Sequence, residues 1–488
     1  MSDTQARFRR AFPGIALTIF LSAVDQTIVA TALPAIAAGM GGMERTSWIL
    51  VAYLVAATCA APVFGQLGDA HGRKPLLFVA LAVFATGCVG CAAAPNLPVL
   101  VGARIVQGFG GGALLTMAQA LIGEAIPPRE RGQYQAWIAG SFAFASAFGP
   151  VVGGYVTQWL GWRAVFVILM PLVGLCAALA MRVERLPPAR GGVRLRFDWA
   201  GLLLFVVAVA AALVALDRAR RLDPALLPAA IGLALLAAAA TALLLRVERA
   251  AHDPLLPLAV FAEPSIARAY LLSACVVGAQ VGLISFLPVW LQTVRGMAPG
   301  PSGLMLLALS MGGASGALFS GRMVARTGHA MRWPTIFLPV GALVWAGLAI
   351  VAASLPLAML PPLTAVAAFC SGTSYPVVQV TAQAAAGRER LGAASAGVAF
   401  SRNIGAATGT ALVAAVIFAA LSLTGTGTAP AFQRLVAEGP GFLAALGPEA
   451  AAALRAELAE AFRMLFVTAA VLTAIAAVLA WKVPLRRF

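Results

Sequence analysis

Two ionisable residues lie inside apolar stretches of the sequence, where charge is costly. Asp25 is in the middle of the membrane-length segment 17–34, and Arg104 lies roughly two helical turns inside another apolar segment. A charge at mid-bilayer costs about 2.5–3.5 kcal/mol on insertion scales, so a group kept there usually has a function. A carboxyl group in an apolar medium favours its neutral form, so it can bind a proton from one side and release it to the other. We expect Asp25 to carry protons, with Arg104 as its charge partner. A packing hydrogen bond is the alternative for Asp25.

The composition indicates an integral membrane protein. Hydrophobic residues make up 61% of the 488 and charged residues only 11%, against about 25% charged in soluble domains. The net charge of +16 raises nucleic acid as a partner. However, the arginines occur singly or in short groups between apolar stretches, which is typical of the positive-inside rule. We therefore expect no nucleic-acid partner. The six cysteines all fall in apolar segments, so free thiols are expected.

Apolar windows predict 14 membrane-spanning helices. They lie near residues 14–37, 47–68, 75–94, 98–122, 135–158, 161–182, 199–216, 224–246, 267–291, 302–324, 333–353, 357–384, 392–420 and 462–483. If the N-terminus is cytoplasmic, most lysines and arginines fall in cytoplasmic loops. The sequence therefore predicts a multi-pass protein of the cytoplasmic (inner) membrane, with both termini in the cytoplasm and the lipid bilayer as its surroundings.

The predicted spans group into three parts. These are an N-terminal six-helix bundle over 1–182, a cytoplasmic connector with two extra membrane helices over 183–262, and a C-terminal six-helix bundle over 263–488. A long external loop is expected at about 421–461, with a short amphipathic helix over 448–462. A weak repeat supports two related halves, because residues 65–74 follow the second helix of one bundle and residues 321–328 follow the second helix of the other.

Four motifs occur in order along the chain: residues 25–34 in the first helix, 65–74 after the second, 104–112 in the fourth and 147–154 in the fifth. Together they resemble the major facilitator superfamily, and within it the 14-helix drug:proton antiporter family. The resemblance covers nearly the whole chain. It implies an all-α integral membrane protein with the major facilitator fold, in which two six-helix bundles are joined by two extra helices.

The motif after the second helix is similar to the superfamily's cytoplasmic gate. Its glycines permit a tight turn, and Asp69 can meet an arginine or the positive end of a neighbouring helix. The gating residues that the resemblance implies are Gly65, Asp69, Gly72, Arg73 and Lys74. Two positions depart from the family pattern, Ala70 in this motif and Ala325 in its second copy. A solvated charged turn is the alternative.

The fifth-helix motif resembles the signature that marks antiporters rather than symporters. Gly149 and Gly153 give a small-residue face, and Pro150 bends the helix. The resemblance extends this motif to Gly154. The glycine run in the fourth helix favours close helix contact rather than a phosphate loop, because no strand precedes it.

Substrate contacts are expected near the middle of the membrane. By resemblance, Arg402 is the arginine of the C-terminal half, and residues 372–376 predict a break in the twelfth helix. The candidates for substrate binding are Asp25, Gln107, Phe286, Trp290, Tyr375, Arg402 and Asn403. Cation selection would depend on Asp25 and on the aromatic members of this set.

Energy is expected from a proton gradient, without a cofactor. The chain has two lysines, Lys74 and Lys482, and neither follows a glycine, so it has no Walker A loop. The three histidines all fall in predicted cytoplasmic loops, so no metal centre is expected.

The sequence and the resemblance together predict a transporter rather than an enzyme. We expect a proton-coupled antiporter that exports drugs or other lipophilic or cationic small molecules by alternating access. One alternative is a dedicated exporter of a single metabolite or a self-resistance pump, and another is a transport-inactive membrane sensor. A periplasmic adaptor and an outer-membrane channel stay open as partners.

Overall fold

The computed structural model describes most of the chain, and every regular element in the described residues is a helix. The described ranges are 3–40, 43–182, 198–220, 227–250, 262–297, 299–387, 390–424 and 446–485, with positions 428, 431–432, 434–435 and 442 between the last two. The residues next to the predicted boundaries, 183–197 and 251–261, and most of the segment 421–461 lie outside these ranges.

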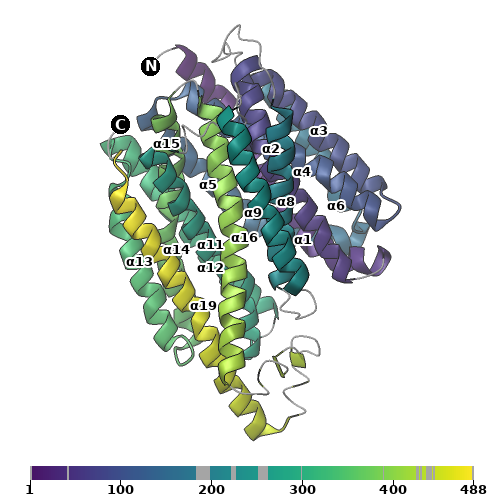
Figure 1. Ribbon diagram of the computed structural model, residues 1–488, viewed down its shortest axis with the longest axis vertical. Helices are drawn as coiled ribbons and strands as arrows, with labels where there is room; N and C mark the ends of the chain where they lie inside the picture. The colour runs from purple at the N-terminus through teal and green to yellow at the C-terminus, as the bar shows by residue number, and fades with distance from the viewer. Residues whose placement is uncertain are drawn as a thin grey trace.

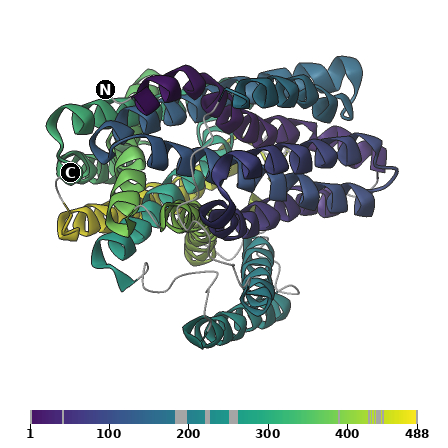
Figure 2. The same ribbon diagram turned by 90° about the horizontal axis from the view of Figure 1, so that it is seen from above.

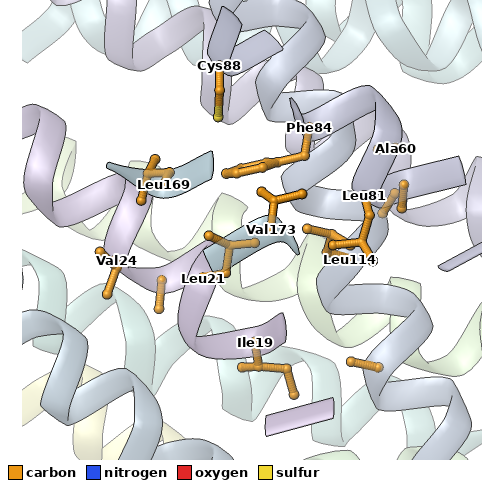
Figure 3. Packing of buried hydrophobic residues seen from close by; sticks show 14 of the residues in the cluster. Ile19, Leu21, Val24, Ala60, Leu81, Phe84, Cys88, Leu114, Leu169 and Val173 are labelled. Atoms are coloured by element: carbon orange, nitrogen blue, oxygen red, sulfur yellow. The ribbon is translucent and has the colours of Figure 1, made fainter. Parts of the chain in front are cut away.

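The N-terminal helices pack around one apolar core. They are α1 (Asp3–Met40), α2 (Met43–His71), α3 (Arg73–Ala93), α4 (Leu97–Ala125), α5 (Pro128–Leu160), and the consecutive α6 (Ala164–Val167) and α7 (Leu169–Ala180). Asn96 begins α4 by accepting a hydrogen bond from the backbone N–H of Val99, 3.1 Å away. In Figure 3, Phe84 of α3 and Leu169 and Val173 of the sixth span gather between the helices.

The C-terminal helices form the second half of the molecule. They are α11 (Pro264–Thr293), α12 (Pro299–Thr327), α13 (Arg332–Val351), the 3-10 turn η2 (Leu357–Met359), α14 (Leu360–Gly372), α15 (Ser374–Ala386), α16 (Leu391–Thr424) and α19 (Pro448–Lys482). The predicted break in the twelfth span is confirmed, since α14 ends at Gly372 and α15 begins at Ser374.

The two extra helices lie outside both bundles. The helices α8 (Trp199–Arg220) and α9 (Leu227–Ala250) pack on each other, and α8 also contacts α2 and α16. Figure 2 shows this pair projecting from one side of the molecule. Phe205 of α8 lies 5.3 Å from Phe400 of α16, measured between ring centres. The pair therefore touches both halves along one flank.

Each of the 14 predicted spans falls on a helix or on consecutive helices. In the part of the chain that the structure describes, ten helical stretches are long and apolar enough to cross a membrane, and two shorter apolar stretches lie at Ala164–Ala180 and Trp199–Ala215. The helices α5 and α12 are long enough to cross a membrane but are not among these ten stretches. The chain is therefore a multi-pass helical membrane protein, and the number 14 stays a prediction.

Helices occupy both ends of the segment that the sequence predicts as an external loop. The helix α16 runs on to Thr424, and residues 448–462 are the first part of α19, a continuous helix of 35 residues. The expectation of a separate short helix was wrong. Leu454 and Leu458 are buried, so the same apolar stripe that suggests an amphipathic helix packs onto the C-terminal half.

The two halves meet through equivalent helices. The main contacts between them join α2 to α16 and α5 to α12. Since α2 and α12 are the second helices of their halves, and α5 and α16 the fifth, the two contacts are related by the internal repeat. Both chain ends lie at the same end of the molecule (Figure 1). We call this the terminal end, where α2 finishes and α16 begins.

Candidate functional site

Asp25 and Arg104 form an ion pair that is sealed inside the N-terminal half. Arg104 Nη1 of α4 lies 3.1 Å from both carboxylate oxygens of Asp25 on α1, and both side chains are 0% exposed. The Tyr53 ring of α2 lies under the guanidinium, 4.2 Å from Arg104 Cζ. Three helices therefore enclose the two intramembrane charges that the sequence singles out.

Gln107 connects this ion pair to two cysteines on α3. Its Nε2 donates to Asp25 Oδ1 at 2.9 Å, and its Oε1 accepts from Arg104 Nη1 at 2.8 Å. The thiols of Cys88 and Cys91 lie 3.1 and 3.3 Å from the same amide. Because Gln107 is 0% exposed, it orients the ion pair in this conformation instead of facing a substrate. Both thiols are free, as are the other four cysteines.

The burial of the pair determines what it can do. Water does not reach Asp25 in this conformation, so a proton can be exchanged only after the surrounding helices move. Protonating Asp25 alone would leave Arg104 buried without its counter-charge, and breaking a buried pair this way typically costs about 3–5 kcal/mol. If Asp25 binds a proton, Arg104 would have to rearrange with it.

The predicted gate is centred on Arg73, which is 3% exposed. Its Nη2 lies 2.5 Å from Asp69 Oδ1, its Nη1 donates to Ala120 O at 2.5 Å, and its Nε lies 3.5 Å from Glu124 Oε2. Gly72 has φ 86°, which favours glycine and lets α3 begin directly after α2. Lys74 reaches the backbone oxygen of Met181 at 2.9 Å.

Asp69 also lies against the opposite half. A Cβ atom built on Gly392 would come within 2.9 Å of Asp69 Oδ1. Gly392 is in the first turn of α16, where unpaired backbone N–H groups give the helix a positive end. The carboxylate thus joins the α2–α3 turn to a helix of the other half.

Two glycine pairs bring the halves into backbone contact at the terminal end. A Cβ on Gly65 of α2 would lie 3.0 Å from Gly392 O, and a Cβ on Gly321 of α12 would lie 2.2 Å from Gly132 O of α5. These two contacts are equivalent under the internal repeat. Of these four glycines, only Gly65 is among the gating residues predicted from the sequence, although the internal repeat aligns Gly321 with it.

A cluster of amides, also absent from the sequence predictions, closes the same region. Gln383 Nε2 of α15 donates to Gln119 O of α4 at 3.1 Å and to Ser395 Oγ of α16 at 3.0 Å. Gln135 of α5 donates to Gln119 Oε1 at 2.6 Å. Uncharged amides carry no distinctive sequence signal, so only the structure reveals this link between the halves.

The fifth-helix motif packs against the helix that carries Asp25. A Cβ on Gly149 would lie 2.0 Å from Thr27 Oγ1, and one on Gly153 would lie 2.6 Å from Ile28 O. By contrast, Gly154 has nothing within 4 Å of such an atom. Pro150 is exposed within α5. Two of the three motif glycines therefore allow close contact with α1, and the third does not.

The remaining substrate candidates divide into two groups. Trp290 is 1% exposed and packs edge-on against Phe466, so in this conformation it belongs to the core of the C-terminal half. Phe286, Tyr375, Arg402 and Asn403 are partly buried. Asn403 Nδ2 donates to Thr58 Oγ1 of α2 at 2.7 Å, which places it between the halves. Among the described residues, no cluster of three metal-binding side chains occurs.

Comparison with known proteins identifies the class. The chain belongs to the major facilitator superfamily, whose family model matches residues 15–410. It is 33% identical over 343 residues to the efflux pump FUS6 of Gibberella moniliformis, covering 68% of this chain and 60% of that protein. It is 30% identical over 334 residues to the acurin A biosynthesis cluster MFS-type transporter of Aspergillus aculeatus, covering 66% and 59%.

The chain thus spans about three fifths of the length of these two relatives. The human organic anion transporter MFSD10 (TETRAN) has the same fold, with a TM-score of 0.65 at 15% identity over 98% of this chain and 100% of that one. The predicted membership of the superfamily is confirmed. The chain is a multi-pass membrane protein of this superfamily of transporters, and relatives in the family are named efflux pumps.

Proposed function

We propose that this transporter exports a lipophilic small molecule in exchange for protons, with Asp25 as the proton carrier. The observation that supports the proposal most directly is the sealed Asp25–Arg104 pair, 3.1 Å between charged atoms and 0% exposed. A structural hydrogen bond would not need two charges at this depth, since neutral groups would form it at lower cost.

The contacts between the halves support an alternating-access cycle. Closure at the terminal end uses Asp69, Arg73 and the two glycine pairs, whereas α5 carries its motif glycines against α1. A movement of α5 relative to α1 would disturb the helix that holds Asp25. Opening of the halves could in this way expose the carboxyl group on one side at a time.

The orientation follows from the charge bias in the sequence. We place the terminal end in the cytoplasm, both chain ends with it, and the protein in the cytoplasmic membrane. The cycle uses protons and the substrate and needs no cofactor.

Proton release tests this proposal. In weakly buffered detergent solution, the purified wild-type protein should release protons when a transported compound binds, and Asp25→Asn should not. Asp198→Asn, at the start of α8, is a matched control, because Asp198 hydrogen-bonds the backbone of Gly201 outside the bundles. Release of wild-type size from Asp25→Asn would refute the assignment and make Glu124 the next candidate.

A dedicated exporter of a single metabolite is the second candidate. The name of one relative, a transporter of the acurin A biosynthesis cluster, favours this kind of role. Growth of an efflux-deficient host on a panel of toxic compounds separates the two. Resistance to many unrelated compounds supports a multidrug pump, while resistance to one compound or none, with normal expression, supports the dedicated exporter. A transport-inactive sensor would give neither resistance nor proton release.

A further inference from the structure

The C-terminal half holds an arginine near the middle of the bundle that has no counter-charge among the residues that the structure describes. Arg402 is the twelfth residue of α16, which places it about 16 Å from the first residue of that helix. No carboxylate among the described residues pairs with it. Its Nη2 donates to the backbone oxygen of Tyr375 at 3.2 Å, and this is its one hydrogen bond to the described residues.

Arg402 keeps N–H groups that have no acceptor among the described residues. Its Nε is shielded from solvent and has no acceptor, although an arginine can donate five hydrogen bonds. The side chain as a whole is only partly buried. Part of the side chain is therefore accessible to a bound molecule, which could supply a further acceptor.

Other interior arginines of this chain have more partners among the described residues, although Arg104 Nη2 and Arg131 Nη1 also lack an acceptor. Arg104 faces Asp25, Arg73 faces Asp69, and Arg295 donates to the backbone oxygens of three residues, Ala352, Ala353 and Leu355. A cation away from water is costly unless it is paired. Arg402 differs from these arginines because it has a single hydrogen bond to the described residues, to a backbone oxygen.

We propose that Arg402 receives the anionic oxygens of the transported molecule, so that the substrate is a lipophilic organic acid rather than a cation. A guanidinium binds a carboxylate through two parallel hydrogen bonds. The Tyr375 ring lies 5.7 Å from Arg402 Cζ and offers an apolar surface beside the charge. This inference depends on the proposed export function and specifies its substrate class.

The site adjoins the interface between the halves. The next residue, Asn403, donates to Thr58 of the N-terminal half at 2.7 Å. An acid bound at Arg402 would therefore lie one residue from a contact that must break when the halves separate. Occupancy of the site and separation of the halves would be linked through α16.

A purely structural role for Arg402 is the competing explanation. Its hydrogen bond to Tyr375 O lies beside the break between α14 and α15 and could simply stabilise that break. This role predicts lower stability of an Arg402 variant and no preference of the protein for acids. The two explanations differ in binding selectivity.

Equilibrium binding to the purified full chain provides the test. The probes are 2-naphthoate, 4-phenylbenzoate and deoxycholate, each measured beside its primary amide. At least one acid should bind wild type more tightly than its amide. Arg402→Gln should weaken the binding of that acid by about tenfold to a hundredfold, as expected for a lost charge-assisted hydrogen bond, and leave the amide unchanged. Arg402→Lys should lie between.

The matched control is Arg332→Gln, which removes one exposed positive charge at the start of α13 and should change neither affinity. Equal affinity of the acids for wild type and Arg402→Gln would overturn the proposal. So would tighter binding of the amides, or no binding of any acid. If Arg402→Gln fails to fold, the acid–amide comparison in wild type and Arg402→Lys decides the question.

This assay is done in detergent without a pH gradient, so it does not depend on proton coupling. If Asp25→Asn still releases protons while acids bind through Arg402, the coupling scheme fails and the substrate class stands. If proton release requires Asp25 but the affinity for acids does not depend on Arg402, the coupling scheme stands and the proposed substrate class fails.

Discussion

Adding a single methyl group at Gly321 should shift the transporter away from the closed terminal end. A Cβ at Gly321 would lie 2.2 Å from Gly132 O and 2.7 Å from Ala136 Cβ. Ordinary contacts are about 3.5–4.0 Å, so Gly321→Ala must separate α12 from α5 or strain both. Overpacking of this kind costs about 1–3 kcal/mol. Because the cost falls only on the closed state, the equilibrium should move about 5- to 160-fold toward the open one.

Two further variants test whether the effect follows the geometry. Gly65→Ala is the equivalent change in the other half, but its Cβ would lie 3.0 Å from Gly392 O, so we expect a smaller shift. Gly347→Ala is the control on α13, because a Cβ at Gly347 has nothing within 4 Å. We therefore expect the largest shift in Gly321→Ala, a smaller one in Gly65→Ala and the smallest in Gly347→Ala.

Spin labels can measure these shifts. His71 and Thr327 are exposed and lie at the ends of α2 and α12, one in each half. Cysteines placed at these positions can be labelled selectively, because five native thiols are buried and the sixth, Cys275, is partly buried. The distance distribution should broaden toward longer values in Gly321→Ala. An unchanged distribution in that variant, or an equal change in Gly347→Ala, would refute the role of the glycine pairs.

Three further outcomes are expected. Gly149→Leu should abolish export while the protein still inserts and folds, because the new side chain meets Thr27. Gly154→Leu is the control and should export normally. Equal export activity of the two variants in everted vesicles would contradict the role of this helix face. Asp69→Asn should slow turnover more than it weakens substrate binding, since it removes the charge that joins Arg73 to the opposite half; loss of affinity with unchanged spin-label distances would argue against a latch. If the substrate is a monovalent acid exchanged for one proton, each export cycle moves two charges and should accelerate under an inside-negative potential. The potential contributes about 2.3 kcal/mol per charge per 100 mV to the driving force. An export rate that does not respond to the potential in potassium–valinomycin vesicles would exclude that stoichiometry.

The charged residues of the N-terminal half could be paired from the sequence because alternatives are few. Asp25 is the only carboxylate well inside a predicted span, and an arginine at similar depth needs a partner. The structure places Arg104 against it. The glycine spacing of the fifth helix likewise indicates a close-packed face, although spacing alone could not show that Gly154 lies off that face.

Other parts of the site could not be predicted from the sequence. Trp290 looks like a substrate contact because aromatic residues serve both cores and binding sites, and only burial distinguishes these roles. The amide cluster around Gln383 uses residues common on any helix. The extent of α19 was missed because an amphipathic pattern predicts a helix but not whether it joins the next one. Long-range packing decides each case.

The placement of α8 and α9 makes the two flanks of the transporter unequal toward the lipid. The seam between α2 and α16 is covered by α8, with Phe205 against Phe400. Among the helices that the structure describes, none of the inserted pair lies over the seam between α5 and α12. A lipophilic molecule that diffuses laterally in the bilayer would therefore meet α8 at the α2–α16 seam but neither inserted helix at the α5–α12 seam. The insertion therefore makes the surroundings of two otherwise equivalent seams different, because α8 packs beside one seam and the inserted pair makes no comparable contact at the other.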